Sequence, residues 1–154
     1  GYNVMVSDYT RYFSLRAYFR QFTQLQIGIV MGMVNVKQIF DENFYRGVEG
    51  GILEGFGKLF PDNTRLFIYP EMNEEGQVTE FTDVKVPEHL RFLYRHLLEN
   101  GFLHGIECSD PALFNIYSRQ ILKQLASGQS GWQESLPDGV ADEIIKHKFF
   151  GYRG

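Results

Sequence analysis

The residues with the clearest chemical potential are Ser118, Arg119 and Lys123, at the start of a segment with helical spacing. A hydroxyl and two cations at that place lie near backbone N–H groups that have no partner within the helix. The two cations oppose the helix dipole, whereas a bound anion would reverse the sign of that interaction. The pattern therefore indicates a phosphate site. One alternative stays open, in which Arg119 and Lys123 extend into solvent or pair with an acid.

Metal and nucleophile chemistry have less support in the sequence. The histidines His89, His96, His104 and His147 stand apart, and neither H-E-x-x-H nor C-x-x-C occurs. No metal site is expected. Cys108 follows an apolar run and lacks a neighbouring base that would form its thiolate, so a buried structural cysteine is the favoured interpretation.

The glycine-rich stretch 47–57 invites comparison with a phosphate-binding loop. Neither G-x-x-x-x-G-K-[ST] nor a strand followed by G-x-G-x-x-G is met, since Lys58 is not followed by a hydroxyl residue. Close helix packing explains the glycines more simply.

Three apolar runs supply the strands that would position these residues. Residues 25–32, 65–70 and 102–108 are short and nearly uncharged, which is typical of strands buried on both faces of a parallel sheet. The acidic stretch 71–83 is predicted to be a solvated loop with a short edge strand at 78–82. The fold class predicted is therefore α/β, with a small, mostly parallel sheet and flanking helices.

Apolar spacing predicts five helices around that sheet. Asp8 is placed as the N-cap of the first, Ser118 as the N-cap of the fourth, and Pro137 at the start of the fifth. Tyr117 and Leu122 are placed as a hydrophobic staple on the fourth helix. The five predicted segments are 8–22, 52–60, 87–100, 118–127 and the one that Pro137 opens.

Length, charge and composition limit the classes of protein to which this chain can belong. At 154 residues one domain over 1–154 is expected, and 15 Lys and Arg against 19 Asp and Glu give a formal charge of −4, which offers no general attraction for nucleic acid. No apolar run is long enough to span a bilayer, so no membrane partner is expected. A single cysteine fits a reducing, cytoplasmic location.

The order of the motifs resembles a known family. Residues 116–152, IYSRQILKQLASGQSGWQESLPDGVADEIIKHKFFGY, are similar to the end of nicotinate-nucleotide and nicotinamide-nucleotide adenylyltransferases, where I-S-S/T-T-x-I-R precedes a helix, a glycine and V-P-x-x-V-x-x-Y-I. Upstream, DYT at 8–10 resembles that family's S-Y-T, IGIVMGMVNV at 27–36 its strand ending in G-A-D-N-L, and LFIYP at 66–70 its strand ending in R-P. The resemblance covers nearly the whole chain, as the C-terminal half of such an enzyme.

The resemblance implies a Rossmann-like nucleotidyltransferase half-domain that binds a nucleotide, with ATP and Mg²⁺ as possible ligands and no covalently bound cofactor. Thr10, Gly32, Asn35 and Ser118 match family motif positions, and Arg119 and Lys123 complete the implied nucleotide or phosphate site. The family's H-x-G-H is absent, and its G-x-D aspartate is Val34 here. The resemblance thus implies a part that is not catalytic by itself, with the histidines supplied from sequence upstream of Gly1.

These departures also favour a different class of function. The chain is alternatively a non-catalytic module that keeps the fold and binds a protein partner or senses a ligand. The partners expected are therefore a phosphate-bearing small molecule together with the missing N-terminal portion or another protein, and a homo-oligomer stays open.

Overall fold

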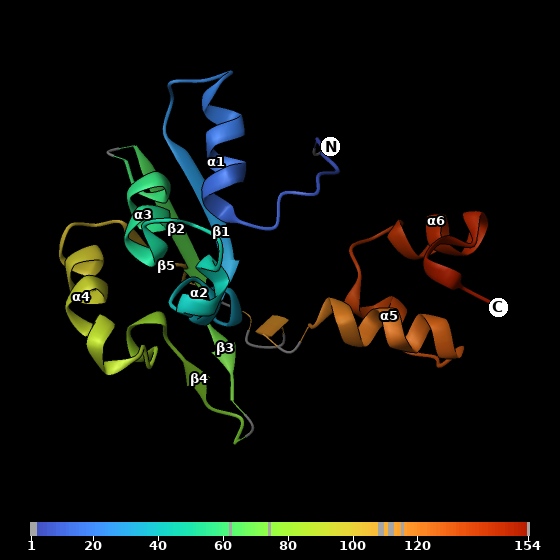
Figure 1. The fold of residues 1–154 in the computed structure, drawn as a ribbon. Coiled ribbons are helices and arrows are strands. Elements are labelled where there is room, and N and C mark those ends of the chain that lie inside the picture. Colours follow the sequence, from blue (N-terminus) through green and yellow to red (C-terminus); the bar gives the residue numbers. More distant parts are fainter. Residues whose placement is uncertain are drawn as a thin grey trace. The chain divides into compact units, whose positions relative to one another are not determined.

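A computed structural model of the chain describes residues 3–61, 63–73, 75–107, 110, 113–114 and 116–153 (Figure 1). The chain divides into two compact units, Gly1–Cys108 and Ser109–Gly154, here called the N-terminal and C-terminal units. The expectation of one domain over 1–154 stays a prediction.

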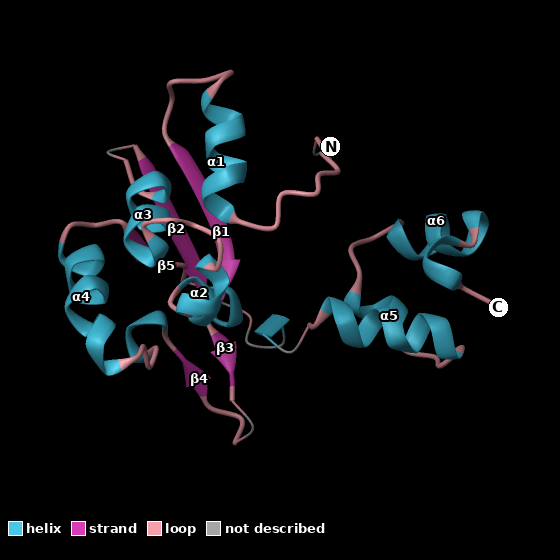
Figure 2. Ribbon diagram, in the orientation of Figure 1, coloured by secondary structure: helices cyan, strands magenta, loops and turns pink. Residues whose placement is uncertain are grey.

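A three-stranded parallel sheet forms the centre of the N-terminal unit. Its strands are β1 (Ile27–Gly32), β2 (Thr64–Tyr69) and β5 (Leu103–Gly105), in the order β1-β2-β5 (Figure 2). Ile29 pairs with Leu66, and Leu66 with Leu103. The α/β class with a small parallel sheet is confirmed.

A separate antiparallel ribbon follows β2. It consists of β3 (Glu71–Met72) and β4 (Val78–Thr79), with Met72 paired to Val78. The short strand predicted at 78–82 is therefore present over its first two residues. It pairs with β3 and not with the parallel sheet.

Three of the four α-helices of the N-terminal unit lie close to predicted segments, whereas the helix Met33–Ile39 lies in none of them. The first begins four residues later than expected, because Arg11 and not Asp8 is its N-cap, without a side-chain capping hydrogen bond. The predicted helix 87–100 consists of a 3₁₀ turn, Glu88–Leu90, followed by α4. The bounds of the α-helices are α1 Tyr12–Arg20, α2 Met33–Ile39, α3 Gly51–Leu59 and α4 Arg91–Glu99.

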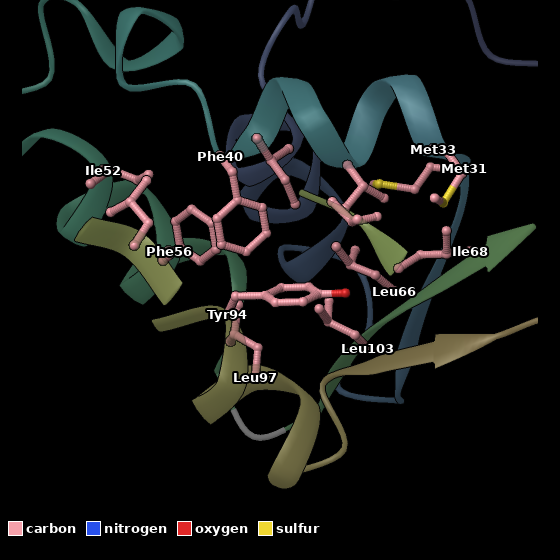
Figure 3. Packing of buried hydrophobic residues seen from close by; sticks show 14 of the residues in the cluster. Met31, Met33, Phe40, Ile52, Phe56, Leu66, Ile68, Tyr94, Leu97 and Leu103 are labelled. Carbon is pink, nitrogen blue, oxygen red and sulfur yellow. The ribbon is translucent and has the colours of Figure 1, made fainter. Parts of the chain in front are cut away.

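The main core lies between the sheet and α2, α3 and α4. Leu66 and Ile68 of β2 are 0% and 1% exposed, and they meet buried side chains from all three helices. Figure 3 shows Phe40 and Phe56 side by side near the ring of Tyr94, with ring centroids of Phe40 and Tyr94 5.4 Å apart. This packing fixes which face of each strand is buried.

The expectation that the strands are buried on both faces is wrong. Val30 of β1 is 64% exposed and Tyr69 of β2 is 46% exposed, whereas their neighbours Met31 and Ile68, which face the other way, are buried. The physical reason is that α2, α3 and α4 contribute to one core on one face of the sheet. We call the opposite face the open face and define it by its side chains in register, namely Gly28, Val30, Gly32, Arg65, Phe67, Tyr69 and His104.

Two glycines of β1 allow aromatic rings to lie flat on the open face. A β-carbon at Gly28 would lie 3.0 Å from Cε2 of Phe67, and one at Gly32 would lie 2.8 Å from the hydroxyl oxygen of Tyr69. The Phe67 ring also stacks on His104, with centroids 5.3 Å apart. On the open face, two glycines are therefore covered by aromatic rings.

The C-terminal unit consists of short helices around one buried tryptophan. Trp132 is 1% exposed and packs with Ile121, Leu125 and Ile144. Gly128, in the left-handed conformation (φ 69°), ends the first helix as predicted. The bounds are α5 Ser118–Ser127, a 3₁₀ turn Trp132–Ser135, α6 Val140–His147 and a 3₁₀ turn Phe149–Gly151.

Two predicted helix starts in this unit are wrong. The N-cap of α5 is Tyr117, and Ser118 is already the first helical residue, so the serine hydroxyl makes no capping hydrogen bond. This also rules out Tyr117 as the residue before the cap, the position that the predicted staple with Leu122 requires. The N-cap of α6 is Gly139, with φ 80°, and the two residues after Pro137 form a turn before the helix begins.

Among the residues that the structure describes, no helix has the length and apolar character needed to cross a membrane.

Candidate functional site

Gly32 and Asn35 lie at the carboxyl end of β1, where the chain passes directly into α2. Gly32 ends the strand and is the N-cap of the helix, and Asn35 is the third helical residue and is half-buried. Ligands of open α/β sheets bind at this end of the strands, at a point where the strand order reverses. Here the described sheet runs in one direction, β1-β2-β5, so it contains no such reversal.

Tyr69 is a residue that sequence reasoning missed at this end of the sheet. Its ring occupies the space beside Gly32 that a side chain would otherwise fill. Burial raises the pKa of nearby Tyr12, and the charge of ionised Tyr69 raises it further. The sequence feature that could have identified Tyr69 is the alignment of IGIVMG with TRLFIY as neighbouring parallel strands, because this alignment places Gly32 beside Tyr69.

Thr10 lies in the extended segment before α1 and is exposed. Its hydroxyl makes no hydrogen bond to another described residue. The predicted role of this threonine in holding a phosphate therefore stays a prediction.

Ser118, Arg119 and Lys123 lie on the first turns of α5, and all three are exposed. Within the part of the chain that the structure describes, neither Arg119 nor Lys123 forms an ion pair. All seven ion pairs among the described residues involve other basic side chains, five of them in the N-terminal unit and two on α6. Of the two alternatives for these cations in the absence of a ligand, extension into solvent is the one observed.

The six predicted site residues fall into separate groups. Thr10, Gly32 and Asn35 belong to the N-terminal unit, whereas the group on α5 belongs to the C-terminal unit.

The histidines contact groups close to them in the fold. His89 Nε2 lies 2.9 Å from a carboxylate oxygen of Glu42, and His104 Nε2 lies 2.9 Å from the carbonyl oxygen of Gly101. His147 lies 3.2 Å from Glu143 on the same helix. Over the described residues, no three His, Cys, Asp or Glu side chains are grouped so that they could hold a metal ion. Cys108, predicted to be a buried structural cysteine, lies outside those residues.

The glycine-rich stretch 47–57 forms a turn and most of α3. A β-carbon at Gly55 would lie 2.1 Å from Cε1 of Tyr45, so this glycine lets the helix approach the tyrosine ring. The hydroxyl of Tyr45 donates a hydrogen bond to the carbonyl of Ile39 at 2.8 Å. At Gly55 the glycine therefore serves close packing, as the sequence predicts.

Comparison with known proteins adds no identification, because no family model, curated protein or solved structure matches this chain.

Proposed function

We propose that this chain binds a phosphate-bearing small molecule, as a part of an adenylyltransferase-like protein that is not catalytic by itself. The observation that carries the proposal is the exposed pair Arg119 and Lys123 at the start of α5, which lacks acidic partners among the described residues. Cations placed at the positive end of a helix destabilise it until an anion binds there. The parallel α/β sheet is consistent with a nucleotide-binding fold, and the resemblance supplies the ligand class.

The start of α5 offers several groups to a phosphate. Its first backbone N–H groups have no partner within the helix. The hydroxyl of Ser118 makes no capping bond and is available as a further donor. Arg119 presents a planar fork that matches two phosphate oxygens, and Lys123 presents a compact positive charge. ATP with Mg²⁺ is the ligand that the resemblance implies.

The test is a titration with ATP and with nicotinate mononucleotide while thermal unfolding is followed. Trp132 is the only tryptophan and lies in the core of the C-terminal unit, so its fluorescence reports on the unit that holds α5. A ligand at 100 times its dissociation constant should add about 2.7 kcal/mol of stability. Arg119→Ala and Lys123→Ala should lose most of that shift.

Lys146→Ala is the matched control, because this α6 lysine contacts Glu143 at 3.3 Å and lies outside the proposed site. It should keep the full shift. Absence of a shift in the unaltered chain, or an equal shift in the Arg119 and Lys123 variants, would contradict the proposal. Formation of a dinucleotide by this chain alone would contradict the non-catalytic part.

The open face favours a second candidate, a module that binds a protein. Parallel sheets are usually covered on both faces, and exposed apolar patches often mark interfaces. Val30 and Tyr69 are the most exposed of its large apolar side chains. If the open face binds a second copy of this chain, sedimentation velocity should show an average mass that rises with protein concentration. The Val30→Lys variant should keep the mass of a monomer. A constant monomer mass would remove self-association from this candidate.

A further inference from the structure

A hollow lies beside α1, facing α3, and the predicted site residues are not part of its lining. Its volume is about 450 Å³, which is within the range of small-molecule sites. Side chains of α1, together with Tyr9 before the helix and Lys58 of α3, line it. We call this space the α1 hollow.

Arg16 is a charged group of the α1 hollow that has no hydrogen-bond or ion-pair partner among the described residues. Its Nε is buried without a hydrogen-bond partner, and none of its other nitrogens bonds to a described residue. Arg20, one turn later, bonds to the carbonyls of Thr23 and Leu25 at 3.0 Å and to Oδ1 of Asn63 at 2.6 Å. The Nε of Arg20 is also buried without a partner, but both of its terminal nitrogens bond to the protein, whereas no nitrogen of Arg16 bonds to a described residue.

The electrostatic surroundings of Arg16 are positive. Burial lowers the pKa of its guanidinium, and the nearby charge of Arg20 lowers it further, yet an arginine stays protonated. Lys58 also lines the hollow, and none of the described residues that line it is acidic, although Glu54 on the same helix pairs with Lys58. In a chain of net charge −4, the hollow is therefore lined locally by basic and not by acidic side chains of the described residues.

Two further polar side chains face the same space. Ser14 and Gln21 line the hollow, and neither side chain hydrogen-bonds to another described residue. Together with Arg16 they offer several donors, while the hydroxyl and the amide oxygen also accept.

Aromatic rings form the apolar part of the wall. The rings of Tyr9 and Tyr18 lie 5.6 Å apart at 42°, and Phe13 completes the set. Lys58 lies over the Phe13 ring, with its Nζ 5.9 Å from the centroid. Such walls suit a flat ring, because aromatic pairs gain from stacking beyond the area that they bury.

We propose that the α1 hollow binds a planar aromatic ring that carries one carboxylate or phosphate group. The anion contacts the guanidinium of Arg16, with Ser14 and Gln21 as additional hydrogen-bond partners, and the ring packs against Tyr9 and Tyr18. A guanidinium fork matches two oxygens of either anion. This site is in the N-terminal unit and is independent of the phosphate site proposed on α5.

The experiment uses benzoate and phenyl phosphate as probes of the two anions, in ¹H–¹⁵N spectra of the full chain. Benzamide tests the need for charge, and cyclohexanecarboxylate tests the need for a flat ring. At least one anionic aromatic probe should shift the amides of residues 9–21 and 58 in a saturable way. Benzamide and cyclohexanecarboxylate should each bind at least about 10-fold more weakly, a factor that corresponds to 1.4 kcal/mol.

Arg16→Met keeps much of the apolar stem and removes the guanidinium, so it should weaken binding of the anionic probes by about 10-fold or more. Arg16→Lys keeps the charge without the fork and should retain part of the affinity. Ser14→Ala provides a milder change should either arginine variant fail to keep a dispersed spectrum, and it should weaken binding several-fold. Lys146→Ala lies outside both proposed sites and should leave the shifts of residues 9–21 as they are in the unaltered chain, which controls for the loss of one positive charge.

Three results would overturn the inference. One is that neither anionic probe saturates. Another is that folded Arg16→Met and Ser14→Ala bind as tightly as the unaltered chain. The third is that the shifted amides lie on α5 and not around α1, which would leave the proposed function standing and remove this site.

Discussion

The cores of the two units differ in how many buried residues contribute to their stability. In the N-terminal unit, buried side chains from three strands and three helices form one cluster around Leu66 and Ile68. In the C-terminal unit, three small or medium side chains surround Trp132, with Leu136, Ala141 and Tyr152 partly buried beside it. The tryptophan ring is 5.8 Å from that of Tyr152. One residue is therefore central to the second core, whereas no residue is so dominant in the first.

This difference follows from size. The C-terminal unit spans residues 109 to 154, which is 46 positions, and a unit of that length has a stability of about 2–7 kcal/mol. A buried tryptophan contributes a large part of such a total. The N-terminal unit is larger and spreads the same kind of burial over many contacts.

The largest expected effect is that of Trp132→Ala. Removing a fully buried tryptophan costs about 3–5 kcal/mol, which is comparable to the whole stability expected of this unit. Amide resonances of α5 and α6 should lose their dispersion, while those of the parallel sheet should stay. Trp132→Phe, which keeps a ring, should retain the folded unit. Loss of dispersion in both units together would show that the two cores unfold as one.

A smaller effect is expected from Leu66→Ala in the N-terminal unit. Leu66 is fully buried on the central strand, so the change should cost about 2–5 kcal/mol by urea denaturation, confined to this unit. Val30→Ala, on the open face of the same sheet, is the matched control and should stay within about 0.5 kcal/mol. A large cost at Val30 would indicate that the open face is covered in solution.

Alkaline pH should produce a smaller difference in stability between the two units. Burial raises the pKa of Tyr12, Tyr45 and Tyr94, all in the N-terminal unit. A tyrosine whose pKa is raised in the folded state adds to the free energy of unfolding. This contribution is complete below the ordinary tyrosine pKa of about 10 and is lost as the pH rises from there through the raised pKa. Circular dichroism and tyrosinate absorbance, followed together upward from pH 9, should show the sheet unit weakening as these groups ionise. Tyr45→Phe should weaken this dependence, and an unchanged alkaline profile would contradict the assignment.

Much of the N-terminal fold could be predicted from the sequence, because its signals are local. Apolar runs bounded by glycine or proline gave β1, β2 and β5, and the spacing of leucines gave α4. Burial on both faces was predicted wrongly, because a run such as IGIVMG is also apolar where it faces outward. Whether a second layer covers a strand depends on distant parts of the chain, which strand composition does not encode.

The candidate site was less predictable, for reasons that particular residues illustrate. Ser118 was predicted to be the N-cap of α5, but it is the first helical residue. A serine before a helical pattern fits either position. The role of Arg16 could not be distinguished from that of Arg20 by spacing alone. It became distinct only when the positions of Asn63 and the 23–25 loop were known.

The rings that lie over β1 place a constraint on how the sequence can vary. A β-carbon at residue 28 would lie 3.0 Å from the Phe67 ring, and one at residue 32 would lie 2.8 Å from the hydroxyl oxygen of Tyr69. A side chain gained at Gly28 would require the Phe67 ring to shift by a few tenths of an ångström, and one gained at Gly32 would require the end of the Tyr69 side chain to move. Each glycine and its ring are therefore expected to evolve as a pair, so that homologous chains lacking one also lack the other.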